Sequence, residues 1–281
     1  RLAEMAGRYR ANVQLIEKPW GEAFSLPEIE AALIEHRPAI LALVHAETST
    51  GVCQPMDGIG DLCRKHNCLL VLDTVTSLGA VPVLLDTWKV DLSYSCSQKG
   101  LSCPPGLSPF TMGPRAEEKL AARNGKVPNW YLDVSLLNQY WGSDRVYHHT
   151  APVNMNFGMR EALRLLAEEG LEKAWDRHRS NAEVFWAGLE RLGLVLHVPE
   201  HLRLPTLTTV RIPDGLDGNA FRLYLLNDHG IEIGGGLGSL AGKIWRIGLM
   251  GYNSTPENVE RLLNLFEAEL PRFRENVSFA A

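Results

Sequence analysis

The feature of the sequence that most constrains its fold is a short apolar run that ends in an acid, Leu69 to Asp73. Consecutive apolar residues without polar alternation suit a strand that is buried on both faces of a parallel sheet. Open α/β sheets bind their ligands at the carboxyl ends of the strands, which is where Asp73 would lie. A carboxylate directly after four apolar residues is costly unless a cation pairs with it, so we expect Asp73 to face a cationic group.

Strand-like and helix-like segments alternate around this run. We predict further strands at 39–44, 90–94 and 108–112, and helices at 57–66 and 115–123. Such alternation predicts an α/β fold with a mostly parallel sheet and right-handed crossover connections.

Four more segments complete the first half of the chain. The sequence predicts a helix at 1–9 and a strand at 13–16. Another helix is predicted to begin after Ser25, because serine caps a helix and Pro27 is tolerated in its first turn. The aromatic-rich segment 130–150 is predicted to be irregular.

The pattern changes after two long helical stripes, near 159–167 and 175–192, of which the second is expected to cross between domains. Beyond Leu194 the sequence predicts strands at 195–198, 207–212, 231–233 and 244–249, with helices at 220–228 and from 256 onward. We therefore predict a large domain at 1–172 and a smaller α+β domain, with its linking helix, at 173–281.

Lys99 follows the predicted strand 90–94 and lies among small residues, Ser95 to Gly100. A lysine after a strand is usually solvated, but small neighbours leave room for a bulky group bonded to its amine. A lysine that forms an imine with an aldehyde cofactor must be neutral to attack. The ring nitrogen of such a cofactor needs a carboxylate to stay protonated. Asp73 and Lys99, on neighbouring strand ends, supply both groups.

Five motifs extend this pattern along the chain. They are HAETSTGV at 45–52, LDTV at 72–75, SQK at 97–99, YHHT at 147–150 and RIGL at 246–249. In their residues, order and spacing they resemble the alanine–glyoxylate and serine–pyruvate aminotransferases, a class V family of fold-type I pyridoxal-phosphate enzymes. The resemblance runs from the first residue to near the last. It implies ping-pong transamination between alanine or serine and glyoxylate or pyruvate, and a place in glyoxylate metabolism.

The resemblance implies pyridoxal 5′-phosphate as the cofactor and assigns residues to it. Lys99 would hold the cofactor covalently and move a proton as general base and acid. Asp73 would pair with the ring nitrogen, and Val75 would lie beneath the ring. Thr48 would donate a hydrogen bond near the ring hydroxyl, and Gln98 would approach the phosphate.

The YHHT loop carries two further cofactor residues by resemblance, Tyr147 and Thr150. In the family this loop reaches the phosphate bound by the other subunit, which implies a homodimer. Adjacent residues generally point apart, so His148 and His149 are not expected to bind a metal together.

Arg246 is the candidate for binding the substrate carboxylate. It lies between Trp245 and Ile247 on a predicted strand, where a charge is poorly solvated. A planar guanidinium binds a carboxylate with two hydrogen bonds, and every amino acid or keto acid substrate has a carboxylate. The alternative is a purely structural pair with an acid such as Glu232.

Composition narrows the remaining functional classes. The formal net charge of −5 over 281 residues gives no support for nucleic acid or an anionic membrane as a partner. No apolar run approaches the ~20 residues needed to cross a bilayer. The odd number of cysteines, five, favours reduced thiols in a cytoplasmic compartment, and no spacing suggests a metal site. Peroxisomal or mitochondrial targeting stays open, because the sequence does not begin with Met.

Two alternatives to the transaminase interpretation stay open. The first is a cysteine desulfurase-like lyase of the same fold, although such enzymes carry a histidine where Gln98 lies and a mobile cysteine loop. The second is a truncated chain that dimerises without catalysis. The resembled family carries, before the region matched here, a gating arm, a glycine-rich phosphate turn and an aromatic residue that stacks on the cofactor. A dinucleotide fingerprint at 236–241 is rejected, because a strand and not a helix is predicted after it.

Overall fold

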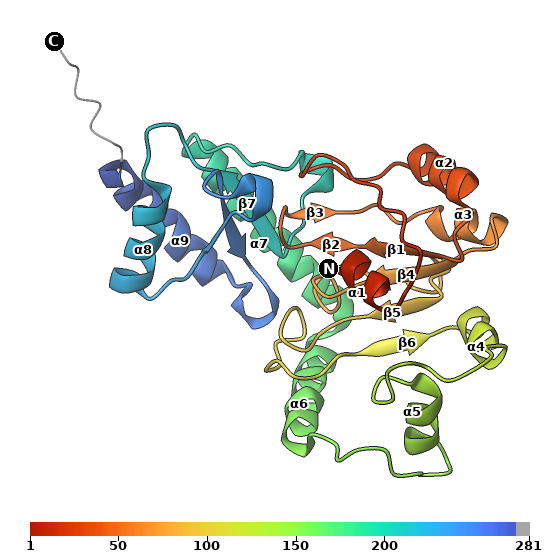
Figure 1. The fold of residues 1–281 in the computed structure, drawn as a ribbon. Coiled ribbons are helices and arrows are strands. Elements are labelled where there is room, and N and C mark those ends of the chain that lie inside the picture. The colour runs from red at the N-terminus through yellow and green to blue at the C-terminus, as the bar shows by residue number, and fades with distance from the viewer. Residues whose placement is uncertain (274–281) are drawn as a thin grey trace.

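In a computed structural model, which describes residues 1–273, the run Leu69–Asp73 forms strand β4 at the centre of the larger sheet. The order of that sheet is β1-β4-β5-β6. Strands β1 and β5 pair with β4 in parallel, and β6 pairs with β5 in antiparallel orientation at the edge (Figure 1). The α/β architecture with a mostly parallel sheet is therefore confirmed.

The elements are as follows. The helices are α1 (Leu2–Arg8), α2 (Leu26–His36), α3 (Ile59–Lys65), α4 (Pro114–Ala121), α5 (Val134–Trp141), α6 (Val153–Glu169), α7 (Leu171–Arg191), α8 (Gly218–His229) and α9 (Pro256–Glu269). The strands are β1 (Ile40–Val44), β2 (Ala46–Glu47), β3 (Val52–Cys53), β4 (Leu69–Asp73), β5 (Leu92–Tyr94), β6 (Phe110–Met112), β7 (Leu207–Arg211), β8 (Gly234–Gly235) and β9 (Ile244–Gly248).

Two helix starts that the sequence predicts have the expected caps. Ser25 and Glu28 form a capping box at α2, in which Glu28 accepts from both the backbone and the hydroxyl of Ser25. At α9, the Thr255 hydroxyl accepts from the backbone N–H of Asn258 at 3.2 Å. Each cap satisfies backbone donors that the first helical turn leaves unpaired.

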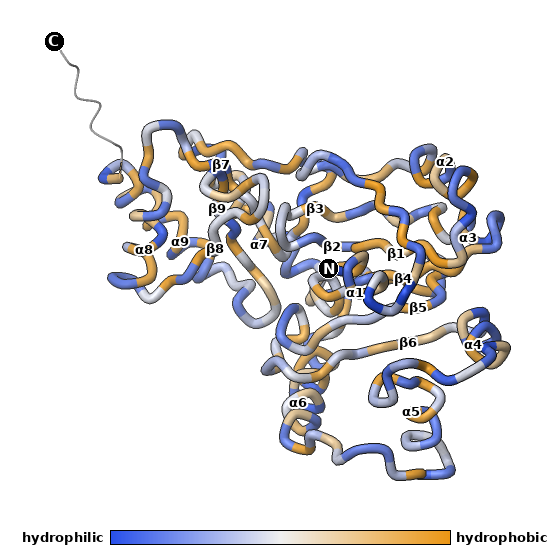
Figure 2. The backbone as a smooth tube through the Cα atoms, viewed as in Figure 1, coloured by the Kyte–Doolittle hydropathy of each residue, from blue (hydrophilic) through white to orange (hydrophobic). Residues whose placement is uncertain are grey.

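The first hydrophobic core lies between the larger sheet and helices α2 and α3. Leu70 and Leu72 of β4 are fully buried against Ile59 and Leu33, and Figure 2 shows β1 and β4 as hydrophobic segments. The intervening residues of β4 are only half-buried. The expectation of burial on both faces was thus met on one face, because among residues 1–273 the helices α2 and α3 cover that face more fully.

A buried ion pair fixes the sheet beside this core. The Asp91 carboxylate, 3% exposed, accepts the Leu70 N–H at 2.8 Å and is paired with Arg115 at 2.9 Å. Arg115 also donates to the Cys68 carbonyl at 3.1 Å. A buried carboxylate with these donors is fully compensated, and it ties α4 to the start of β4 and β5.

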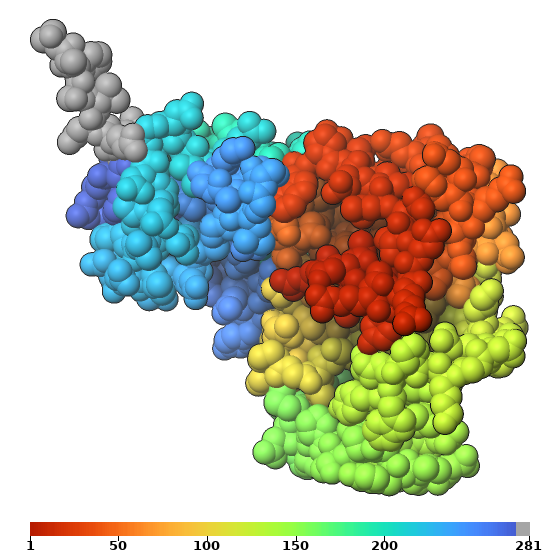
Figure 3. Space-filling model, in the orientation of Figure 1, coloured from red at the N-terminus to blue at the C-terminus, as the bar shows by residue number. Residues whose placement is uncertain are grey.

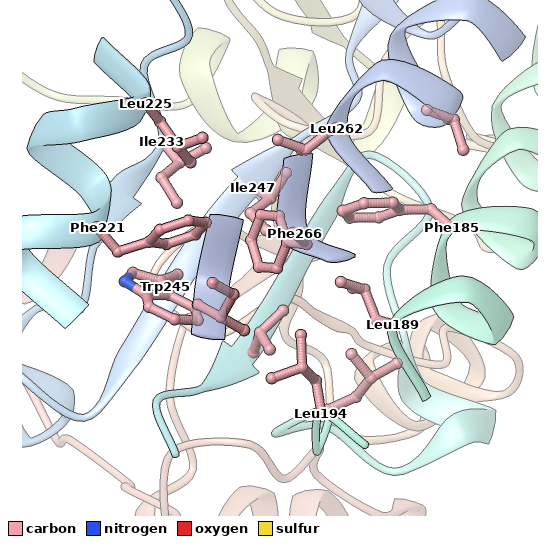
Figure 4. Close-up of a cluster of buried hydrophobic side chains, with 14 of the residues drawn as sticks. Phe185, Leu189, Leu194, Phe221, Leu225, Ile233, Trp245, Ile247, Leu262 and Phe266 are labelled. Atoms are coloured by element: carbon pink, nitrogen blue, oxygen red, sulfur yellow. The ribbon is translucent and has the colours of Figure 1, made fainter. Parts of the chain in front are cut away.

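The second core belongs to a three-stranded antiparallel sheet, β7-β9-β8, covered by helices α7, α8 and α9. Phe221, Trp245 and Phe266 form its centre, with ring centroids 5.0–5.7 Å apart (Figure 4). Phe185 and Leu189 of α7 complete it and are fully buried. The predicted helix 175–192 therefore packs with this second sheet.

Four local predictions were wrong. Residues 13–16 form no strand, because they have no pairing partner in the described part of the chain and Leu15 is 66% exposed. The segment 130–150 contains helix α5, which Asp133 caps by accepting from the Ser135 N–H. Residues 195–198 form only an isolated bridge to β7, and the strand predicted at 231–233 lies instead at Gly234–Gly235.

Other features of the described chain bear on the rejected classes. A short 3-10 turn and then β9 follow the glycines at 236–241, so the dinucleotide-binding helix is absent there, as predicted. No helix within residues 1–273 has the length and apolar character to span a membrane. The same residues contain no cluster of three or more His, Cys, Asp or Glu arranged to hold a metal ion.

Candidate active site

The carboxyl ends of β4 and β5 bring Asp73 and Lys99 to the same edge of the sheet. Asp73 is the last residue of β4 and is paired in register with Tyr94, the last residue of β5. Lys99 follows Tyr94 on the connection to β6 and is half-buried. Since β4 and β5 are parallel, both connections leave the sheet on the side where α/β folds bind ligands.

Asp73 is held in place by two donors. Its Oδ1 accepts the Val75 N–H at 2.9 Å, and its Oδ2 accepts the Tyr94 hydroxyl at 2.6 Å. Burial and the hydrogen bond to Asp73 raise the pKa of Tyr94, so the phenol stays a neutral donor. The sequence analysis missed Tyr94, and only the strand register, which aligns the two carboxyl ends, could have indicated it.

The serines before Lys99 fix its connection to neighbouring backbone. Ser95 Oγ donates to the Thr74 carbonyl at 2.9 Å, and Ser97 Oγ donates to the Pro104 carbonyl at 2.7 Å. Both serines are buried. We expected small residues here to leave room for a bound group, and the structure adds that they anchor the segment against β4.

Cys96 lies between the acid and the lysine. Its thiol contacts the Val75 carbonyl at 3.7 Å. Burial raises the pKa of this thiol, and the charges of both Lys99 and Asp73 also act on it. The two charged groups therefore lie on either side of one half-buried side chain.

Arg246 reaches this edge from the second sheet. Its Nε donates to the Gly235 carbonyl at 2.7 Å, and its Nη1 donates to the Thr48 carbonyl at 3.1 Å. A Cβ on Gly234 would lie 3.2 Å from Nη2, so the glycine leaves space for the guanidinium. Within residues 1–273 no carboxylate lies within ion-pair distance of Arg246, so the structure lacks the structural pair with Glu232.

Further contacts join the second sheet to the same edge. Thr209 Oγ1 donates to the Thr50 carbonyl at 2.6 Å, and Thr206 Oγ1 donates to the Thr76 carbonyl at 3.3 Å. Both threonines are buried. The segments that follow β2 and β4 are therefore each tied to the sheet that carries Arg246.

The structure does not bring the YHHT loop to this edge within one chain. Tyr147 and Thr150 lie on the connection between α5 and α6, apart from the end of β5 in Figure 1. Their hydroxyls are hydrogen-bonded to each other at 2.9 Å, and Tyr147 is 72% exposed. His148 anchors the loop by stacking on Trp130 with a centroid distance of 4.1 Å. Both hydroxyls therefore face outward.

A groove of about 580 Å³ lies elsewhere, between α7 and α9. Its lining includes Val184, Arg191 and Leu263 and none of the residues named above as site candidates. It is not the place where Asp73, Lys99 and Arg246 converge.

Comparison with known proteins identifies the family. A model of the aminotransferases of class V matches residues 2–262. The chain belongs to the class-V aminotransferases. Enzymes of this family use pyridoxal phosphate.

The most similar class-V aminotransferases share a name. Alanine–glyoxylate aminotransferase of Oryctolagus cuniculus is 47% identical over 266 residues, which are 93% of this chain and 68% of that protein. The (S)-ureidoglycine–glyoxylate transaminase of Bacillus subtilis is 39% identical over 98% of this chain and 71% of its own length. A crystal structure of alanine–glyoxylate aminotransferase from Nostoc sp. superposes with a TM-score of 0.93 at 64% identity, covering 95% of this chain and 71% of that one. The chain thus spans about two thirds of the relatives it matches.

The residues at the sheet edge fit the cofactor of this family. A carboxylate has about four acceptor sites, and Asp73 uses one on each oxygen, so it can accept a further N–H. The Lys99 amine forms no hydrogen bond or ion pair that the described residues provide. An acid with spare acceptors and an uncommitted lysine are the two groups that a pyridine aldehyde requires.

Proposed function

We propose that this aminotransferase moves an amino group between alanine or serine and glyoxylate or pyruvate. The observation that carries the proposal is the convergence of Asp73 and Lys99 on one sheet edge, with Arg246 bonded to the Thr48 carbonyl beside it. The names of the relatives, which act on glyoxylate, support the choice of substrates.

Each residue has a distinct task in the proposed reaction. When bound, pyridoxal phosphate supplies an electron-accepting ring and an aldehyde that takes up the amino group. Asp73 accepts a hydrogen bond from the ring nitrogen and favours its protonated form. Lys99 holds the cofactor covalently at rest and then, as a free amine, takes the proton from the substrate Cα. Thr48, Val75 and Gln98 are assigned to cofactor binding, at the positions given by the resemblance.

Two organisational proposals accompany this function. We place the boundary between a large cofactor-binding domain and a smaller α+β domain at residues 172 and 173, with α7 as the linking helix. The two separate hydrophobic cores support this division. Residues 274–281 of the second domain lie outside the described part of the chain.

The direct test is an assay with purified protein. Alanine with glyoxylate should yield pyruvate and glycine, and serine with glyoxylate should yield hydroxypyruvate and glycine. Product formation should require added or bound pyridoxal phosphate. A protein that binds the cofactor but releases no keto acid from either amino acid would refute the proposal.

The Arg246→Lys variant should weaken the apparent affinity for the amino acid and the keto acid together. Lysine keeps the charge but loses the planar pair of donors, and both substrates present the same carboxylate. We expect KM for each to rise ~10-fold or more, which corresponds to ~1.4 kcal/mol or more of binding free energy. Steady-state titrations in each substrate measure this, with the cofactor absorbance as a control for folding. Unchanged KM values would remove Arg246 from the site.

We further propose a homodimer whose sites are shared, with Tyr147 and Thr150 of one chain serving the phosphate bound by the other. Their exposed hydroxyls, remote from Lys99 in the same chain, support this arrangement. A Lys99→Ala chain mixed and refolded with a Tyr147→Phe, Thr150→Ala chain should regain activity, up to about a quarter of the parent on statistical grounds if one intact site forms per mixed dimer. Mixed dimers without any regained activity would show that each site is built within one chain.

A further inference from the structure

The turn that follows β9 docks on the turn that carries Lys99. The Tyr252 N–H donates to Ser102 Oγ at 2.8 Å, and the Ser102 N–H donates to the Lys99 carbonyl at 2.9 Å. In Figure 3 the two segments, in blue and yellow, meet at the boundary between the two parts of the molecule. Ser102 therefore joins the segment of Lys99 to the segment that leaves the strand of Arg246.

This contact leaves no spare room. Gly251 has φ +57°, and a Cβ there would lie 1.9 Å from Ser102 Oγ and 3.2 Å from the Gly100 carbonyl. Ser102 itself has φ +57°, a left-handed conformation that residues other than glycine seldom adopt. A serine held in that conformation indicates that the surrounding contacts determine its backbone.

Helix α7 holds the other side of the same turn. Arg177 Nη1 donates to the carbonyls of Gly251, at 2.9 Å, and Ser254, at 2.7 Å. Asn181 Nδ2 also donates to the Ser254 carbonyl, at 2.9 Å. Arg177 is oriented in turn by an ion pair with Glu169. The turn is thus fixed from α7 through its own carbonyl groups.

His178 of α7 binds the remaining backbone donor. It is fully buried, and its Nε2 accepts the Gly251 N–H at 2.8 Å while its Nδ1 lies 2.6 Å from the Ala174 carbonyl. This pair of contacts requires the neutral ring with its proton on Nδ1. Burial lowers the pKa of His178, which favours the same form.

We propose that Ser102 and Gly251, backed by Arg177, His178 and Asn181, form a clamp that sets the position of Lys99 relative to Arg246. The inference rests on the proposed roles of those two residues. A substrate held by its carboxylate at Arg246 presents its Cα to the Lys99 amine only if this spacing is kept. Misplacement of reacting groups by ~1 Å can cost ~100-fold in rate, so the clamp residues are positioning residues.

The first test is Ser102→Ala, with Ser180→Ala on the exposed side of α7 as the matched control. Turnover per bound cofactor should fall at least ~10-fold, because the lysine is displaced from the substrate. KM for both substrates should stay within about threefold, since Arg246 is untouched, by the same principle. In cofactor-free protein, hydrogen exchange should accelerate at the Tyr252 amide and stay slow at the Gly251 amide, which His178 protects. The control should change none of these values.

A second variant tests the fit of the two turns. Gly251→Ala should lose turnover in the same way, and the double variant Gly251→Ala, Ser102→Gly should recover part of it, because the colliding hydroxyl is gone. Should Gly251→Ala fail to fold, Ser102→Ala decides alone.

The outcomes separate the clamp from the proposed function. Unchanged turnover per bound cofactor in Ser102→Ala, together with unchanged exchange at Tyr252, would overturn the clamp while leaving transamination in place. A parent protein that cannot transaminate would refute the proposed function instead. In that case the exchange at Tyr252 in the cofactor-free protein still decides whether Ser102 holds the turn.

Discussion

The Lys99→Ala variant is expected to lose transamination by ~1000-fold or more, about 4 kcal/mol of transition-state stabilisation. The change removes the group that holds the cofactor and the base that takes the Cα proton. It should leave folding intact, because the Lys99 amine makes no hydrogen bond or ion pair with the described residues. Single-turnover rates at saturating alanine, normalised to bound cofactor, measure the effect.

Two comparisons make this result specific. Lys119→Ala, which removes an exposed lysine of α4, should keep the parent rate. A small primary amine added to Lys99→Ala should restore part of the rate, since it can act as the base in the vacated space. A Lys99→Ala rate within tenfold of the parent would show that another group moves the proton.

The second large effect is expected from Asp73→Asn. An amide is a poor partner for a protonated ring nitrogen, whereas the carboxylate of Asp73 offers a full charge and spare acceptor sites. Turnover should fall by several orders of magnitude, a loss of more than ~4 kcal/mol, while the cofactor still binds. Asp86→Asn, an exposed change after β4, is the matched control. A rate within about tenfold of the parent would assign Asp73 a purely structural role.

Tyr94→Phe separates the two parts of this effect. It removes the 2.6 Å hydrogen bond to Asp73 and keeps the carboxylate. The loss should be far smaller than that of Asp73→Asn, because the charge beside the ring nitrogen is retained. An equal loss would mean that orientation by Tyr94, and not charge, is what Asp73 requires.

The sequence was informative where the physical signal is local. The apolar run ending at Asp73 and the caps at Ser25 and Thr255 depend on neighbours within a few residues, and β4, α2 and α9 form where predicted. The strand predicted at 13–16 failed because its residues have β character but no partner to pair with among the described residues. Helix α5 was missed because aromatic residues obscured a short helix capped by Asp133.

The site was predictable only in part for the same reason. The shared edge of Asp73 and Lys99 follows from parallel strands and could be predicted. The bond from Arg246 to the Thr48 carbonyl joins residues 198 positions apart and depends on how two separate cores pack. The contacts of Tyr94 with Asp73, and of Ser102 with Tyr252, depend likewise on strand register and on turn conformation, which composition does not determine.

The central claim is that Lys99 carries the cofactor opposite Asp73. Reduction of the cofactor-loaded protein with borohydride, followed by proteolysis and mass spectrometry, tests it most directly, because reduction makes the bond between lysine and cofactor permanent. The account predicts a single modified peptide with the cofactor mass on Lys99, and no such peptide from Lys99→Ala. A cofactor mass on any other lysine of the parent protein would contradict it.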